Sequence, residues 1–269
     1  TASDPDTASN QGTVSDQEKT FDPEPDPNAK QVTFTDENRI NEQEQIEQEL
    51  LNTYNEGDYS FEEPFVTVDP YGTAPLTALA MFETDEPTQI TVIVEGKDDD
   101  SDVEKTFSDY QTEHEIPILG LYPDAQNAVT IKATKEDGEV LMTSLSIQTE
   151  PLPDDFLTTE RVEAEPEKME KGMTFIVPSS RYVYAVDANA DVRWYSTLWN
   201  SHVFKRLKNG NLLYLTKEEG QDKYNELLEM DMLGKVTNAY HVEIEGYEKS
   251  NLLHHDLIEF RTETCLPQH

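Results

Sequence analysis

Hydrophobic and polar positions follow several different patterns along this chain, and each pattern predicts a different kind of structure. In the first 34 residues large apolar side chains are nearly missing, while Asp, Ser, Thr, Pro and Asn dominate. Such a segment cannot bury enough apolar surface to offset the entropy cost of ordering. Residues 1–34 are therefore predicted to form a disordered acidic stalk.

A helical spacing follows the stalk. Ile46, Leu50 and Tyr54 recur every four residues, and Gly57 supplies a stop signal. With Thr35 or Asp36 as the N-cap, this pattern predicts a helix from about residue 37 to residue 55, which packs one narrow apolar stripe on a sheet.

Short β-prone runs with turn-forming groups between them fill the stretch from Phe65 to Gln148. Several runs alternate apolar and polar residues, as at Ile90, Val92 and Val94. The runs are FVTV, LTALAMFE, QITVIVEG, VEKTF, HEIPILGL, AVTIKAT and VLMTSLSIQT. About seven short strands at this spacing are typical of an antiparallel β-sandwich of the immunoglobulin or fibronectin type. Together with the helix, residues 35–150 are expected to form an N-terminal domain, and the single cysteine of the chain excludes an internal disulfide.

A proline-rich boundary and then a repeat follow the sandwich. The stretch TEPLPDDF ends the last strand and opens a semi-rigid linker over residues 151–171. Beyond it, Gly172 aligns with Gly210, and Asp187 aligns with Asp231 when one loop of about six residues is inserted. Units of three or four short strands in about 40 to 55 residues have the period of β-propeller blades.

The repeat continues into two histidine-containing segments. His202 aligns with His255, and Leu207 aligns with Phe260. Residues 172–260 are thus predicted to form the first two blades of an incomplete propeller, so the fold class is all-β with one helix. The nine residues after Phe260 carry no turn and no alternation, which favours an unrelated or truncated tail over residues 261–269.

Charge and composition limit the classes of partner that the chain is expected to bind. The chain has 20 basic and 56 acidic residues, a formal net charge of −36. A field of this sign repels phosphate backbones and anionic lipids, so no nucleic-acid partner is expected. No run approaches the roughly 20 apolar residues of a membrane span, so no membrane insertion is expected. The scarcity of cysteine fits an exported protein and a cytosolic one equally well. The stalk favours an exported protein, extracellular or at the cell surface, whose signal or anchor segment is not present in this chain.

Seven segments together carry a specific resemblance. They are DPYGTAPLTALAMFETDEPTQITV, TEHEIPILGLYPDAQNAVTI, TEPLPDDF, YAVDANADVRWYST, HVFKRLKNGNLLYLT, YNELLEMDMLGKV and LLHHDLIEF. This chain resembles the N-terminal portion of the exported bacterial arylsulfate sulfotransferases, which have a β-sandwich followed by a six-bladed propeller. The resemblance implies transfer of a sulfuryl group from a phenolic sulfate ester to a phenol through a sulfated histidine. That chemistry requires no metal and no organic cofactor, because neutral imidazole is a competent nucleophile.

The resemblance also indicates which histidines matter. Neighbouring residues of a strand point to opposite faces, so His254 and His255 cannot both face the centre of the propeller. Asp256 shares a face with His254 and could orient its ring, whereas the alignment with His202 favours His255. Either one is expected to bind substrate by donating a hydrogen bond to a sulfate or phenolic oxygen. No histidine of this chain matches the nucleophile, so no catalytic residue is expected here, and the chain alone is expected to be inactive.

Other signals remain open between two interpretations. Trp194 and Trp199 could stack on an aryl ring, but propeller blades commonly use tryptophan as core filling. Two acidic turns, beginning at Asp98 and Asp187, lack the glycine that a calcium loop needs at its sixth position, so no metal site is expected. The alternative function is a non-catalytic cell-surface binding or assembly module that uses the sandwich, and a homodimer is an expected partner for either function.

Overall fold

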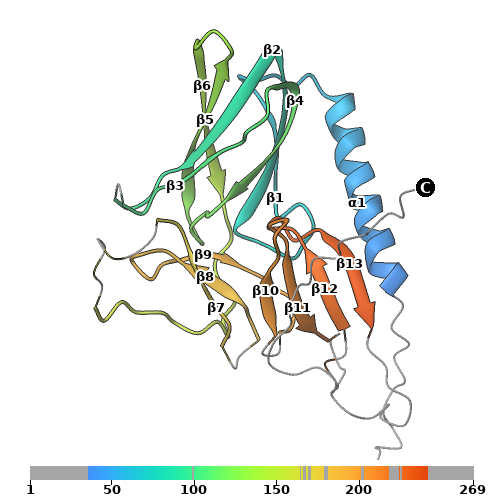
Figure 1. Cartoon of the computed structure of the whole chain (residues 1–269), viewed down its shortest axis with the longest axis vertical. Helices are drawn as coiled ribbons and strands as arrows, with labels where there is room; N and C mark the ends of the chain where they lie inside the picture. Colours follow the sequence, from blue (N-terminus) through green and yellow to red (C-terminus); the bar gives the residue numbers. More distant parts are fainter. Residues whose placement is uncertain are drawn as a thin grey trace, which may run out of the picture. The chain divides into compact units, whose positions relative to one another are not determined.

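The structure is a computed structural model. Its described residues form one helix and three antiparallel sheets (Figure 1). The described residues are 36–241 except for 99, 164, 166–167, 169–170, 179–180, 201–202, 218–223 and 225. The predictions for the stalk and for the tail after Phe260 lie outside these residues.

The first sheet forms the sandwich and is organised around one long strand, β2. Its six strands are β1 (Phe65–Val68), β2 (Thr77–Val94), β3 (Val103–Thr106), β4 (Gln111–Leu119), β5 (Gln126–Lys135) and β6 (Val140–Gln148). The first half of β2 pairs with β1 and β4, and the second half pairs with β3 and β5, which continues to β6. All pairs are antiparallel. The two halves of β2 pair with different strands, and the sheet curls over on itself around β2.

The continuity of β2 corrects one prediction. The group TDEPT, which separates the runs LTALAMFE and QITVIVEG, was expected to be one of the turns between strands, which would give about seven strands instead of six. The structure instead runs β2 through this group, with a shift in register between Glu83 and Thr88. Pro87 falls between the two paired halves of β2, where its missing N–H costs no ladder hydrogen bond.

Helix α1 (Asp36–Glu56) confirms the predicted helix to within one residue at each end. Its stripe of Ile46, Leu50 and Tyr54 packs on a cluster formed by the sandwich, including Phe65 and Leu79. No helix of the described part is long and apolar enough to cross a bilayer.

Two smaller sheets follow, and both are antiparallel meanders of short strands. One sheet contains β7 (Thr174–Ile176), β8 (Tyr184–Val186) and β9 (Val192–Tyr195). The other contains β10 (Phe204–Arg206), β11 (Leu212–Thr216), β12 (Glu226–Met230) and β13 (Val236–His241). We call them blade one and blade two. The predicted all-β fold, a sandwich followed by the first sheets of a propeller, is confirmed.

The repeat is visible in the hydrogen bonds of one hairpin turn in each blade. The Asp187 carboxylate accepts hydrogen bonds from the backbone N–H groups two and four residues later, at 2.9 and 3.1 Å. Asp231 does the same in blade two, at 2.9 and 3.0 Å. The third residue after each aspartate, Ala190 or Gly234, has a positive φ of 64° or 90°. Sequence-aligned residues therefore build the same hairpin in both blades.

Blade one is covered on both faces. Tyr184, Val186 and Val192 belong to the same hydrophobic core as the sandwich strands. Ala185 and Trp194, on the opposite face, pack into a second core with residues of blade two. Trp194 is fully buried and donates its indole N–H to the carbonyl of Met232, so of the two interpretations the core role holds for this tryptophan.

Candidate functional site

The connections between the blade strands fall into two groups. Short turns lie at one end of the sheets, and longer connections lie at the other end. Because the strands are antiparallel, alternate connections leave from the same end of each sheet. The hairpin end has tight turns at 187–191, 207–211 and 231–235. The long-loop end has the longer connections 177–183, 196–203 and 217–225, and the middle one joins the two blades.

The histidines predicted to bind substrate, His254 and His255, come after β13 in the sequence, and their repeat-equivalent His202 belongs to the connection between the two blades. His202 precedes β10 by two residues, and β13 runs away from the hairpin end, so the chain leaves it on the long-loop side. His202, His254 and His255 lie outside the described residues, so their placement stays a prediction. His114 does lie within the structure, buried in the sandwich with its Nε2 3.1 Å from the Thr88 hydroxyl.

Two cations converge on one indole ring at the long-loop end. The Arg181 guanidinium carbon lies 4.8 Å from the centroid of the Trp199 ring, and the Lys217 Nζ lies 5.0 Å from it. The Lys217 Nζ also lies 5.0 Å from the Tyr224 ring. These residues come from all three long connections, and all four are partly exposed. The arrangement places two cations beside aromatic rings, and the sequence of the connection that supplies Lys217 also contains Glu218, Glu219 and Asp222.

Aromatic residues of the linker and of blade one pack together next to the long-loop end. Phe156 stacks on Tyr182 with ring centroids 5.3 Å apart and meets the Tyr195 ring edge-on. The Tyr182 hydroxyl donates a 2.8 Å hydrogen bond to Asp155. Burial, reinforced by Asp155, raises the pKa of Tyr182, and burial raises the pKa of Tyr195 to about 12. Both phenols therefore remain protonated at neutral pH and cannot serve as phenolate bases there.

The hairpin of blade one is joined to the sandwich by a fully buried arginine. Arg193 donates from Nε to the Gly120 carbonyl at 2.7 Å and from Nη1 to the Ser101 carbonyl at 2.8 Å. Its Nη1 also lies 2.9 Å from the Asp187 carboxylate, and its guanidinium stacks 3.8 Å from the Tyr122 ring centroid. The same aspartate that shapes the hairpin thus neutralises the cation that holds it to the sandwich.

The hairpin of blade two is held by the sandwich and the helix together. The Thr73 hydroxyl donates to the Gly234 carbonyl at 2.6 Å. The Gln43 amide of α1 donates to the same carbonyl and accepts from the backbone N–H of Val236. Lys235 forms an ion pair with Glu47 of the helix. The hairpins of both blades are therefore anchored to the N-terminal domain.

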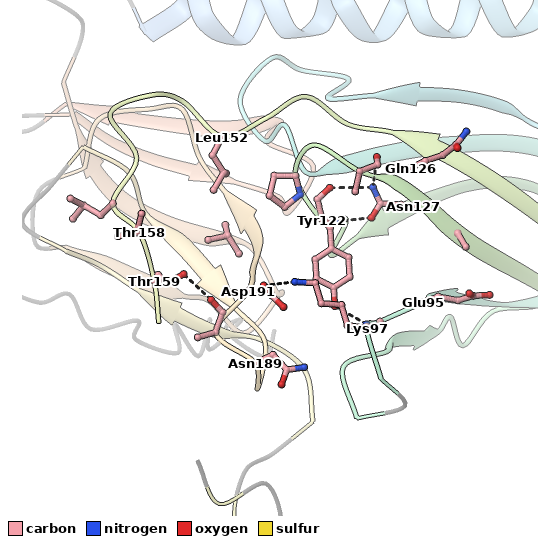
Figure 2. A pocket seen from close by; sticks show the side chains of 17 residues that line it. Glu95, Lys97, Tyr122, Gln126, Asn127, Leu152, Thr158, Thr159, Asn189 and Asp191 are labelled. Carbon is pink, nitrogen blue, oxygen red and sulfur yellow. Dashed lines mark hydrogen bonds and ion pairs between the residues drawn. The ribbon is translucent and has the colours of Figure 1, made fainter. Parts of the chain in front are cut away.

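A pocket of about 630 Å³ lies beside the blade-one hairpin, between sandwich loops and the chain after β6 (Figure 2). The Lys97 ammonium crosses it to form a 2.7 Å ion pair with Asp191, and the Thr159 hydroxyl donates to the Ala190 carbonyl. The hydrogen bond from Lys97 to Asp191 raises the pKa of the lysine. Among the described residues that line this pocket none is a histidine or a cysteine.

Within the described ranges no group of three or more His, Cys, Asp or Glu side chains could hold a metal ion. The long-loop end of the described structure combines two cations and aromatic rings, and Trp199 lies three residues before His202 in the sequence.

Comparison with known proteins matches both parts of the fold. A family model for the arylsulfotransferase Ig-like domain matches residues 65–150, which hold all six strands of the sandwich. A second model, arylsulfotransferase (ASST), matches residues 158–267, which include both blades. The two models together cover most of the chain in the order expected from the sequence. The chain belongs to the arylsulfotransferase family.

Two curated relatives agree with this assignment over a shorter stretch. They are the arylsulfate sulfotransferases AssT of Escherichia coli O6:H1 and of Lelliottia amnigena, each 32% identical over 101 residues. The matched stretch covers 36% of this chain and only 17% of the length of each relative. The match therefore spans only a small part of each relative's length.

Several residues of the chain that take part in these contacts were missed by sequence reasoning. Arg181 and Lys217 stand singly among polar neighbours, and only the fold brings them to one ring. Arg193 sits in the strand VRWY, whose four residues are all buried, so no alternation distinguished it. The available signal was the scarcity of basic residues, which makes each cation in a strand or at a strand end worth examining.

Proposed function

We propose that this arylsulfotransferase chain is the N-terminal part of an enzyme that transfers a sulfuryl group from a phenolic sulfate ester to a phenol. The observation that carries the proposal is the order of the two family matches, an Ig-like sandwich followed by propeller blades. The names of the two curated relatives, both arylsulfate sulfotransferases, support the same donor class.

The proposed reaction has two displacements at sulfur. In the first, a neutral imidazole nitrogen attacks the sulfur, the bond from sulfur to the aryl oxygen breaks, and the phenolate leaves with a proton from an acid or from solvent. In the second, the hydroxyl oxygen of the acceptor phenol attacks the sulfur, the N–S bond breaks, and the phenolic proton goes to a base. Splitting one hard step into two easier ones is the usual advantage of covalent catalysis.

Within this scheme His255, or His254 in its place, donates a hydrogen bond to a sulfate or phenolic oxygen of the substrate. Charge spreads over the sulfuryl oxygens in the transition state, so donors placed around them lower the barrier. We assign the attacking imidazole to a later blade, and we expect this chain alone to be inactive.

A donor–acceptor assay tests this assignment. The purified 269-residue chain is incubated with 4-nitrophenyl sulfate and phenol, and release of coloured 4-nitrophenolate is followed. We expect no release above buffer, and release in the same assay by the gene product that includes the later blades. Turnover by the 269-residue chain would show that a nucleophile is present in it, and an inactive longer product would refute the enzyme proposal in favour of a binding module.

A homodimer through the sandwich is also part of the proposal. Strand β6 forms one edge of the sheet, carries no charged residue, and exposes Met142 (66%) and Val140 (47%). Uncharged edge strands with exposed apolar residues favour pairing with a second strand. Light scattering should show a concentration-dependent dimer that Met142→Lys weakens, whereas a monomer at all concentrations would contradict it.

We further propose that the protein is exported, as its acidic, Pro- and Ser-containing first 34 residues suggest. Fractionation of the source cells should place it outside the cytoplasm; recovery from the cytoplasmic fraction alone would refute this.

A further inference from the structure

A second, smaller pocket lies at the hairpin end, where blade two meets the N-terminal domain. Its volume is about 320 Å³, at the small end of the range for small-molecule sites. Helix α1, the loop between β1 and β2, strands β2 and β4, and the hairpin at 231–235 all contribute residues to its lining. The proposed sulfuryl transfer makes no use of this pocket.

The lining of this pocket is acidic. Three carboxylates come from Glu47 of α1, Glu115 of β4 and Asp231 of the hairpin. Among the described lining residues Lys235 is the only cation, and it pairs with Glu47. Strands β2 and β4 and the loop between β1 and β2 contain no Lys or Arg, and the one basic residue of α1, Arg39, does not line the pocket. Two negative charges are therefore left without a cation in the described lining.

Tyr71 gives an independent indication of a ligand. Its side chain lines the pocket, its ring packs in a cluster with Leu79 and Leu233, and the residue is only 8% exposed. Its hydroxyl nevertheless makes no hydrogen bond to any residue in the described part of the chain. Burial, reinforced by the three nearby carboxylates, raises the pKa of Tyr71, so the phenol is neutral at pH 7. Buried polar groups normally have partners, so this hydroxyl is placed to bond a ligand.

The arrangement of the charges limits the kind of cation that fits. The carboxylates come from three different elements, and the described residues contain no group of three acidic side chains that could hold a metal ion. A compact inorganic cation would therefore meet only part of the negative charge. The lining also includes Leu79, Pro117 and Leu233, whose apolar surface favours contact with methylene groups. A methylene chain with an ammonium group at each end matches both features.

We propose that this pocket binds linear aliphatic diamines in their doubly protonated form. One ammonium group donates a hydrogen bond to the Tyr71 hydroxyl and pairs with a carboxylate, and the other pairs with a second carboxylate. The methylene chain packs on the apolar lining. Because such a ligand contacts the helix, the sandwich and blade two of the folded chain, it stabilises the folded state. The site is additional to the proposed transfer reaction, and no bond is made or broken in it.

Calorimetry and thermal unfolding of the purified 269-residue chain test the proposal. The probe is 1,4-diaminobutane, and butylamine is its singly charged counterpart. We expect saturable binding of the diamine, tighter than that of butylamine, and a thermal midpoint that rises with diamine concentration. Tyr71→Phe keeps the ring and removes the hydroxyl, so it should raise the Kd about tenfold, a typical loss for a hydrogen bond to a charged group. Without diamine this variant should unfold at no lower temperature than the wild type, because the removed hydroxyl has no partner in the described structure.

The matched pair for charge is Glu115→Gln and Glu113→Gln. The two glutamates are exposed on β4 two positions apart, so they point to the same face, but only Glu115 lines the pocket. Glu115→Gln should raise the Kd about threefold, within the range for an exposed ion pair. Glu113→Gln changes the overall charge by the same amount and should leave the Kd unchanged.

Four results would each overturn the proposal: no binding of the diamine, equal binding of butylamine, an unchanged Kd in Tyr71→Phe, or equal weakening by the two glutamate variants. The assay of sulfuryl transfer does not bear on any of them, so this site and the proposed enzyme stand or fail separately.

Discussion

Replacement of Arg193 by methionine tests whether the sandwich and blade one form one cooperative unit. The substitution keeps a side chain of comparable length but removes three hydrogen bonds, one of which is also the ion pair with Asp187. Both partners of that pair are almost completely buried, at 0% and 2% exposed. Breaking a buried pair from one side leaves an uncompensated charge, and this typically costs about 3–5 kcal/mol.

Asp187 retains some partners after the substitution. Its carboxylate still accepts from the backbone N–H groups of the hairpin and lies 3.3 Å from the Tyr122 hydroxyl. We therefore expect the lower part of the range, about 3 kcal/mol. With a urea m-value of about 2 kcal/mol per molar, the midpoint should fall by about 1.5 M. The double variant Arg193→Met, Asp187→Asn should recover part of this loss, because no buried carboxylate is left without its cation.

Tryptophan fluorescence gives a local readout of this unfolding. Both tryptophans, Trp194 and Trp199, belong to blade one or its following loop, whereas far-UV circular dichroism reports all strands. Because blade one shares a core with the sandwich, the two signals should change together. The control Arg206→Met, at an exposed position of β10, should change the free energy of unfolding by less than about 0.5 kcal/mol. Equal midpoints for the Arg193 and Arg206 variants would refute the reasoning.

Two further substitutions probe the anchors of the fold. Gly234→Ala places a Cβ 2.0 Å from the Thr73 hydroxyl, whereas Gly138→Ala has nearly the same φ and meets nothing within 4 Å. The first should cost at least about 2 kcal/mol more than the second in urea unfolding, and equal costs would contradict the close approach. His114 is buried, and desolvation lowers its pKa below the ordinary value. The unfolded chain then binds more protons between that lowered pKa and about 6.5, so stability falls as pH drops through this window. His114→Gln should flatten the pH dependence between pH 7.5 and 5.5, and an unchanged slope would disprove the burial effect.

Local patterns predicted the elements well because each is dictated by its own residues. The stripe of Ile46, Leu50 and Tyr54 determined both the extent of α1 and the face that it buries. The aligned Asp187 and Asp231 predicted equivalent hairpins, and the structure has the same backbone hydrogen bonds at both. A turn that is stabilised by the side chain of one of its own residues can be predicted from the local sequence.

Long-range features could not be predicted from such patterns. Gln43 lies among polar residues of the helix, yet it is 4% exposed because it bonds to the backbone of a hairpin about 190 residues later. The group around Pro87 has the composition of a turn, but pairing on both sides keeps β2 continuous. In each case a tertiary partner outweighs the local preference.

The candidate site was predicted only in outline. The sequence drew attention to His202, His254 and His255 through their alignment, which follows from the repeat. The convergence of Arg181 and Lys217 on Trp199 depends on how three separate loops meet, and no spacing in the chain encodes it.

The most direct test of the central claim is sulfuryl transfer by the gene product that includes the later blades, with 4-nitrophenyl sulfate as donor and phenol as acceptor. We expect transfer by the wild type and a loss of about 10²–10³-fold in kcat/KM for His255→Asn, the size of loss seen when one donor to developing charge is removed. The matched His254→Asn should cost far less. No transfer by the wild type, or an unaffected His255→Asn together with an inactive His254→Asn, would contradict the assignment.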